Sequence, residues 1–319
     1  MPQIAGMVNS AVARAEPAPT DPKLAREAAA RLFRSVRAGR SWLRERSTAG
    51  QGSACVAMKS GNGDPPVFMI PGAPGSILQL APIAGAMAGP MPVHAIRPRG
   101  IEAGETPCGT VPEMAAFAIA AMKSVRPAGP YYLVGYSAGG LVALEMAQLL
   151  TAAGERVPLL VLLDTNPSRA VWPLVCHAEI LGRQAMRAIW ALCRCGPATL
   201  ARRLRSLSGY LAASGVSGLR PLPLMPEGVG AASQRVHEAS FNAGEAYRPS
   251  RYRGKVLIVQ PREIPDLEPR RPAQVWRRYL ADFEVRRVPG THLGLVDDGA
   301  AAVAEAIGDC LNRCGDSQE

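Results

Sequence analysis

The stretch Tyr131-Tyr132-Leu133-Val134-Gly135-Tyr136-Ser137-Ala138-Gly139-Gly140 decides the expected fold. An apolar run ends in Gly-x-Ser-x-Gly, and a nearly all-apolar segment, Ala138 to Leu150, follows as a predicted buried helix. A strand, a tight turn that carries a serine, and a helix in direct succession are typical of a nucleophile elbow. The flanking glycines avoid collisions that a β-carbon would make, and the serine hydroxyl stands at a helix N-terminus, where developing negative charge is favoured. The pattern predicts Ser137 as a nucleophile.

Short apolar runs recur before and after this segment and predict further strands. They are Val67–Ile70, Val93–Ile96, Leu159–Leu163, Lys255–Val259 and Phe283–Val288. Helices are expected between them: Thr110 and Glu113 form a capping box before the apolar run Met114–Met122, and Ala300–Leu311 is the last helix. Strands that alternate with helices predict an α/β fold with a mostly parallel sheet, covered by helices on both faces.

Two regions depart from this alternation. Residues 1–63 are expected to be a basic N-terminal extension, partly mobile or helical, because Met1–Asp21 is rich in alanine and proline and Lys23–Arg46 carries eight basic residues. This extension is either a docking or membrane-surface helix or a solvated helix beside the main domain. The main domain is expected to span residues 64–319, with an insertion at about 167–251. Within it, Glu179–Cys193 and Ala198–Leu207 look helical, and the insertion is predicted to form a helical lid.

The base that would activate Ser137 must come from four histidines. His94 lies inside a predicted strand, and His177 and His237 lie in the insertion. His292 lies just after the last predicted strand, in the segment Val288–Gly294, and a histidine after the serine and the acid matches the chain order of this class of triad. His292 is therefore the expected base.

Two loops offer a carboxylate to hold that histidine. Asp164 ends the strand that follows the nucleophile helix, whereas Glu263 and Asp266 follow the next strand. We prefer Asp164, because the carboxyl end of a strand beside the nucleophile strand lies at the catalytic edge of the sheet.

Two backbone amides are expected to form an oxyanion hole. One is the N–H of Ala138, the residue after the nucleophile, and the other comes from the turn Pro71–Ser76 after the first strand. Ala73 is the best-placed donor in that turn, since the prolines at 71 and 74 have no N–H.

The composition narrows the class of protein. Hydrophobic residues make up 48% of the 319 residues, and the net charge of +10 favours acidic partners. We expect no nucleic-acid partner, because no zinc-finger, RNP-type or helix-turn-helix pattern accompanies the basic residues. Seven cysteines without metal-type spacing predict reduced thiols, no metal site and a cytoplasmic location. We also expect no signal peptide and no transmembrane segment.

The region from Pro65 to Leu150, with Asp164, Lys255–Gln260 and His292, resembles the type I thioesterase domains of nonribosomal peptide and polyketide synthases and related stand-alone thioesterases. These belong to the α/β-hydrolase superfamily. The most specific part of the resemblance is Arg126–Gly140. The resemblance implies a triad acid at Asp164 and a mobile lid over an acyl channel. The turn after the first strand departs from the family, because a glycine-rich run is replaced here by Gly72-Ala73-Pro74-Gly75.

The expected function is therefore a serine thioesterase. It would release an acyl, polyketide or peptidyl chain from the phosphopantetheine thioester of an acyl or peptidyl carrier protein, by hydrolysis or cyclisation through an acyl-Ser137 intermediate. No cofactor of its own is expected, because the pantetheine arm belongs to the partner. The alternatives are a carboxylester hydrolase or lipase-like enzyme and a non-catalytic binding protein with the same fold.

Overall fold

The computed structural model describes residues 53–62, 65–73, 75–194, 205 and 230–315. These residues fall into two compact units. The larger unit contains the described residues of 53–168, 230–263 and 276–315, and the smaller one contains 169–194, 205 and 264–275. Residues 1–52, most of the expected N-terminal extension, lie outside the described residues.

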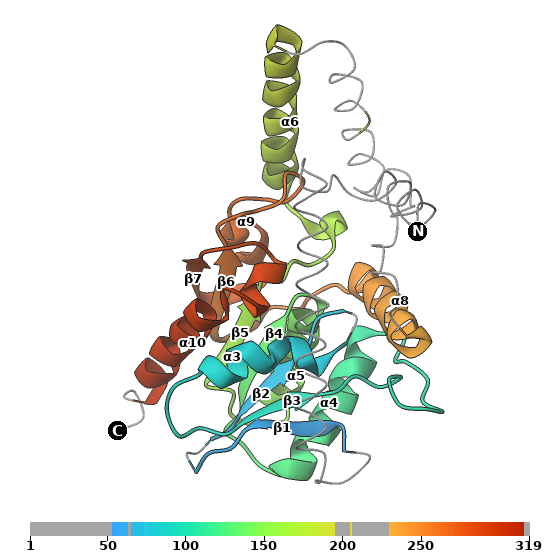
Figure 1. The fold of residues 1–319 in the computed structure, drawn as a ribbon, viewed down its shortest axis with the longest axis vertical. Coiled ribbons are helices and arrows are strands. Elements are labelled where there is room, and N and C mark those ends of the chain that lie inside the picture. The colour runs from blue at the N-terminus through green and yellow to red at the C-terminus, as the bar shows by residue number, and fades with distance from the viewer. Residues whose placement is uncertain (1–52, 63–64, 74, 195–204, 206–229, 316–319) are drawn as a thin grey trace, which may run out of the picture. The chain divides into compact units, whose positions relative to one another are not determined.

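The larger unit is built on a seven-stranded sheet with the order β1-β3-β2-β4-β5-β6-β7 (Figure 1). Strand β1 runs antiparallel to β3, and every other pair of neighbours is parallel. The strands span Cys55–Lys59, Val67–Ile70, Val93–Ile96, Tyr132–Tyr136, Leu159–Leu163, Tyr252–Pro261 and Leu280–Val288 for β1 to β7.

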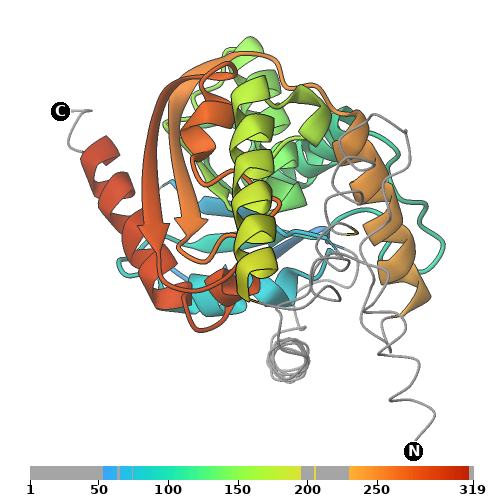
Figure 2. The same ribbon diagram turned by 90° about the horizontal axis from the view of Figure 1, so that it is seen from above.

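Helices cover both faces of this sheet. Helices α3 (Ala81–Ala86) and α10 (Ala300–Gly315) pack with each other on one face, where α10 runs beside β6 and β7 (Figures 1 and 2). Helices α4 (Val111–Val125) and α5 (Ala138–Ala152) contact each other and the sheet. Helix α8 (Ala231–Ala246) packs against α4 and α5. The mostly parallel sheet with helices on its two faces was predicted from the alternation of elements.

The core follows the two-residue period of the strands. Met69, Val134 and Val161 pack in one cluster with residues of α3 and α10, while alternate positions such as Leu133 and Leu160 point to the opposite face. All five residues of β4 and all five of β5 are buried. Parallel strands covered on both faces have continuous apolar sequences. The sequence predicted these strands for that reason.

The predicted strands and the helices expected at Met114–Met122, Ala138–Leu150 and Ala300–Leu311 occur where the sequence places them, whereas β1, α3, α8 and α9 (Pro272–Trp276) were not predicted. The hydroxyl of Thr110 accepts a hydrogen bond from the Glu113 N–H at 3.3 Å, and the Glu113 carboxylate accepts one from the Gly109 N–H at 2.9 Å, so α4 has the expected capped start. Strand β1 was not predicted. It lies within the 1–63 segment assigned to an extension, so the sheet begins before residue 64.

The smaller unit contains a turn of 3-10 helix (Arg169–Val171) and the long helix α6 (Leu174–Arg194). The Arg183 guanidinium donates to the Glu179 carboxylate at 2.9 Å and to the carbonyls of Asp266 and Glu268 at 3.0 and 2.6 Å, which ties residues 264–275 to α6. Helix α9 (Pro272–Trp276) ends this segment.

The predicted lid, about 167–251, lies only partly within the described residues. They include α6, which matches the helix expected at Glu179–Cys193, and α8; the helix expected at Ala198–Leu207 falls outside them except for Arg205. No helix in the described ranges is long and apolar enough to span a bilayer.

Candidate active site

Ser137 occupies the turn between β4 and α5 with a strained backbone, at φ 54° and ψ −124°. The glycines around it are needed for steric reasons. A β-carbon on Gly135 would lie 2.5 Å from the Gly139 carbonyl oxygen, and one on Gly139 would lie 2.3 Å from the Pro71 carbonyl oxygen. The geometry is therefore that of the expected nucleophile elbow, with the serine at the first turn of a buried helix.

His292 and Asp164 are brought together at the carboxyl edge of the sheet. His292 follows β7 and Asp164 follows β5, and the His292 Nδ1 lies 2.7 Å from the Asp164 Oδ2. The carboxylate is 5% exposed and the imidazole 35% exposed. A buried carboxylate on Nδ1 holds the ring in the tautomer whose Nε2 can accept a proton.

The two alternative acids lie in other surroundings. Glu263 is exposed, and its backbone N–H donates a hydrogen bond to the Gly290 carbonyl at 3.1 Å. Asp266 belongs to the smaller unit, where it pairs with Arg187. Asp164 is thus the carboxylate that the geometry favours.

The other three histidines occupy different environments. His94 lies in β3 and stacks on Phe68 with 5.5 Å between ring centroids, and burial lowers its pKa. His237 is buried in α8, and His177 lies in α6 of the smaller unit, 6.0 Å from the Trp172 ring. No group of three histidine, cysteine or acidic side chains suited to a metal ion gathers in the described part of the chain.

Tyr136 supports His292 and was missed by the sequence reasoning. Its hydroxyl donates to the His292 carbonyl at 3.0 Å, and the two rings stack with centroids 5.0 Å apart and 23° between planes. Burial, and then the charge of Asp164, raise the pKa of the Tyr136 hydroxyl, so it stays protonated and remains a donor. The position before the serine is variable in the elbow motif, and no sequence signal marked it.

Thr165 holds the backbone of the elbow through a hydrogen bond to Ser137, and the sequence did not predict this role. Its hydroxyl lies 3.1 Å from the Ser137 carbonyl, to which it donates, and its own carbonyl accepts from the Trp276 indole at 3.1 Å. A β-carbon on Gly140 would lie 1.9 Å from the Thr165 hydroxyl oxygen. The second glycine of Gly139-Gly140 therefore makes room for this side chain.

The two expected oxyanion donors lie next to the nucleophile. Ala138 is the first residue of α5, so its N–H has no partner within the helix. Ala73 lies in a turn closed by a 2.7 Å bond from the Gly75 N–H to the Gly72 carbonyl, and a β-carbon on Gly72 would lie 3.0 Å from the Ser137 Cβ. Both alanines line one pocket, described below. Their role as donors stays a prediction.

Comparison with known proteins agrees with this architecture. Residues 65–193 match the thioesterase domain family. The chain is 31% identical over 192 residues to the nonribosomal peptide synthetase btyA of Aspergillus terreus, covering 56% of this chain and 20% of that protein. It is 40% identical over 142 residues to an indigoidine synthase of Streptomyces lavendulae, covering 44% of this chain and 11% of that one. The chain thus spans a fifth or less of these relatives.

Solved structures show the same fold. The NocB thioesterase domain, in covalent complex with a fluorophosphonate nocardicin G analogue, superposes with a TM-score of 0.54 at 25% identity over 79% of this chain and 96% of that one. The type II thioesterase BorB of the borrelidin cluster superposes with a TM-score of 0.55 at 19% identity, over 83% and 98% of the two chains. The match over residues 65–193 and the shared fold together make this chain similar to thioesterase domains, and its described residues have the α/β-hydrolase fold of those domains.

Proposed function

We propose that this chain releases an acyl or peptidyl chain from the phosphopantetheine thioester of a carrier protein, with Ser137, His292 and Asp164 as the catalytic triad. The observation that carries the proposal is the 2.7 Å contact between the His292 Nδ1 and the buried Asp164 carboxylate, at the same sheet edge as the strained Ser137. The relatives that are named peptide synthetases favour a carrier-bound substrate.

The first half of the reaction transfers the acyl group to the enzyme. His292 accepts the Ser137 proton as the oxygen attacks the thioester carbonyl, and the N–H groups of Ala138 and Ala73 stabilise the oxyanion. The carbon–sulfur bond then breaks, and the imidazolium returns its proton to the leaving pantetheine thiol. The Asp164 carboxylate stabilises the imidazolium between these two proton transfers.

The second half frees the product. Water, or a nucleophile within the acyl chain, gives its proton to His292 and attacks the Ser137 ester, which yields an acid or a ring and restores the serine. No cofactor of the chain's own takes part in this scheme, because the pantetheine arm belongs to the partner. Residues 167–251 remain the proposed lid.

The proposed partner is an acyl or peptidyl carrier protein. Such carriers are typically acidic, and the net charge of +10 favours their approach. We also propose a reducing, cytoplasmic setting, supported by five described cysteines that are all buried and unpaired.

The experiment that tests the function is intact-protein mass spectrometry with an acyl-pantetheine thioester, the matching oxygen ester and a fluorophosphonate. We expect a covalent adduct and thiol release from the native chain, neither from Ser137→Ala, and both from the control Ser124→Ala, whose serine lies on α4 and donates to the Ala121 carbonyl. Turnover of the oxygen ester alone would favour a carboxylester hydrolase. The absence of any adduct would contradict a serine nucleophile and favour a binding protein.

A further inference from the structure

A pocket opens beside the N-terminus of α5, within the larger unit. Its inner end is formed by Gly72, Ala73, Ala138 and Gly139, and it encloses about 650 Å³ of space unoccupied by atoms, open solvent at its mouth included. Pockets that bind small organic molecules have volumes of about 300–1,000 Å³. Because Ala73 and Ala138 are the proposed oxyanion donors, one substituent of a carbonyl held by them lies next to this pocket.

The helices that line the pocket contribute mainly apolar side chains, whereas the loop after β3 adds Arg97 and the exposed Arg99. Three helices contribute residues at spacings of three or four, which share one helical face. They are Val111, Met114, Phe117 and Ala118 of α4, Val142 of α5, and Val236, Ser240 and Gly244 of α8. Ser240 carries the one hydroxyl among the described lining residues, and none of those residues is acidic. The helical side of the pocket therefore offers dispersion contacts and few polar partners, and Arg99 lies on the side of the loop after β3.

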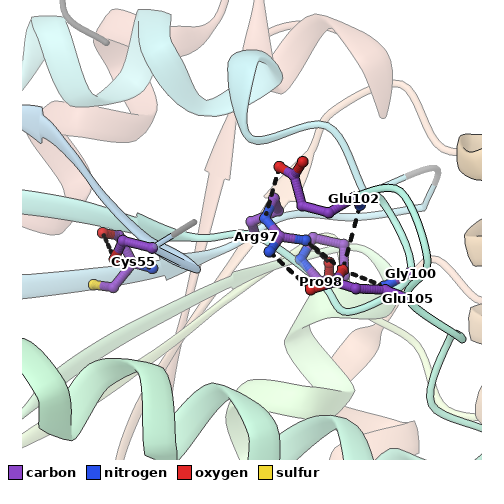
Figure 3. A network of polar contacts seen from close by, with 7 residues as sticks. Cys55, Arg97, Pro98, Gly100, Glu102 and Glu105 are labelled. Carbon is purple, nitrogen blue, oxygen red and sulfur yellow. Dashed lines mark hydrogen bonds and ion pairs between the residues drawn. The ribbon is translucent and has the colours of Figure 1, made fainter. Parts of the chain in front are cut away.

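Another wall is the loop that follows β3, and a partly buried ion pair between Arg97 and Glu105 holds this loop in place (Figure 3). The Arg97 guanidinium donates to both oxygens of Glu105, at 2.7 and 3.1 Å, and the Arg97 side chain is 10% exposed. The same carboxylate accepts the N–H groups of Gly100 at 2.9 Å and Glu102 at 3.3 Å. The charge of Arg97 is thus compensated inside the wall, so this arginine does not make the pocket an anion site.

The wall and α8 meet at the turn after β2. Gly75 has φ +86°, and a β-carbon there would lie 2.6 Å from the Pro98 Cγ and 3.0 Å from the Val236 Cγ1. Close packing at Gly75 joins the loop, the turn and the helix. The pocket therefore has packed walls on the sides of α4, α8 and the loop.

We infer that this pocket holds the distal, apolar part of the acyl chain, an alkyl or aryl group of limited length, and so selects the substrate. The inference rests on the proposed thioesterase function. The pantetheine arm carries two amide groups, and a peptidyl chain carries more; their donors and acceptors would lose water here without gaining partners. A hydrocarbon group has no such cost, and its burial is favourable.

The experiment measures kcat/KM for acetyl, butyryl and octanoyl groups, each as a pantetheine thioester and as a p-nitrophenyl ester. For the native chain we expect the octanoyl-to-acetyl ratio to exceed about tenfold on both leaving groups, since each methylene held in an apolar pocket contributes strongly. Ser240→Phe fills the pocket and should lower that ratio at least about tenfold. The matched control is Ser233→Phe, the same substitution on the first turn of the same helix and outside the lining, which should keep the native ratio.

A second variant tests the opposite direction. Phe117→Ala enlarges the pocket from α4 and should shift the preference towards longer acyl groups. A native ratio near one would overturn the inference. The inference would also be overturned if Ser240→Phe lowered kcat/KM equally for all acyl groups and only on pantetheine thioesters. That result would assign the pocket to the pantetheine arm.

A binding measurement separates this inference from the proposed function. Calorimetry measures the affinity of the pocket for a non-hydrolysable octanoyl-pantetheine ketone. The measurement is made in the Ser137→Ala background, so that no turnover interferes. If Ser240→Phe weakens this binding at least about tenfold, the pocket is sustained. If the chain with Ser137 intact also turns over no ester or thioester, the thioesterase function is refuted while the pocket is not. Binding that is unaffected by Ser240→Phe, in an active enzyme, would refute the pocket alone.

Discussion

Replacing Asp164 by asparagine is the sharpest test of the proposed triad. The substitution keeps the size of the side chain and removes its charge. It also suits the backbone, because Asp164 has φ 42° and asparagine is among the residues that adopt positive φ most readily. A loss of activity can therefore be assigned to the contact with His292 and not to a refolded loop.

The size of the effect follows from the burial of that contact. The Asp164 carboxylate is 5% exposed and its Oδ2 lies 2.7 Å from the His292 Nδ1. A hydrogen bond to a charged group contributes roughly 1.5–3 kcal/mol, which corresponds to about a 10- to 150-fold loss in kcat. An asparagine amide facing Nδ1 would also place the imidazole proton on Nε2, the nitrogen that must accept the Ser137 proton. That tautomer raises the expected loss to as much as about ten-thousand-fold.

The assay is the steady-state release of pantetheine thiol, with the melting temperature of each variant as a check of folding. The matched control is Glu263→Gln, because this exposed acid was the alternative from the sequence and uses its backbone, not its side chain, to bond Gly290. We expect the control to stay within about twofold of the native kcat. An Asp164→Asn variant that keeps more than a tenth of native kcat, or a Glu263→Gln variant that loses a hundredfold, would refute the assignment.

Two further predictions concern the residues that support the site. Tyr136→Phe keeps the ring on His292 but removes the 3.0 Å bond to its carbonyl, so we expect kcat to fall about 3- to 10-fold at unchanged KM; a change in melting temperature without a change in kcat would assign Tyr136 a purely structural role. The hydrogen bond from Arg97 lowers the pKa of Glu105 from 4.5 to about 2. A lowered carboxyl pKa stabilises the fold above the unfolded-state value, and this contribution is lost as the pH falls through the folded-state value. The free energy of unfolding of the native chain should therefore fall more steeply between pH 4.5 and about 2 than that of Glu105→Gln, and parallel curves from chemical denaturation would contradict the wall ion pair.

The sequence predicted the sheet well because its central strands are fully buried. Runs such as Leu159–Leu163 have no polar alternation, which is typical of parallel strands covered on both faces. Strand β1 escaped prediction because it is an antiparallel edge strand with a mixed pattern, in which Cys55 and Met58 are buried and Ala57 is exposed. Edge strands carry weaker signals, since one side of their backbone has no partner strand.

The candidate triad was predictable for a different reason. Ser137 and Asp164 come directly after β4 and β5, and His292 lies in the loop after β7, which ends at Val288. Strand ends can be found from the apolar runs. The supporting residues Tyr136 and Thr165 were not predictable, because their function depends on contacts with residues 156 and 28 positions away in the chain. The Arg97–Glu105 pair lies within one loop, yet a glycine-rich loop offers no periodicity from which to infer its closure.

The backbone strain at the site and the positions of its residues have a common structural origin. Ser137 and Asp164 are the two described non-glycine residues with positive φ, and each is the first residue after its strand. Such conformations cost of order 1–3 kcal/mol each, so neighbouring contacts must hold them. The Ser137 N–H bonds the Leu163 carbonyl, the last of β5, and the Asp164 N–H bonds the Val259 carbonyl of β6, both at 2.8 Å. The ladder thus extends one residue beyond each strand before the chain turns. Because the sheet itself sets where these two residues leave it, the separation of nucleophile and acid is determined by strand register and depends little on the loops.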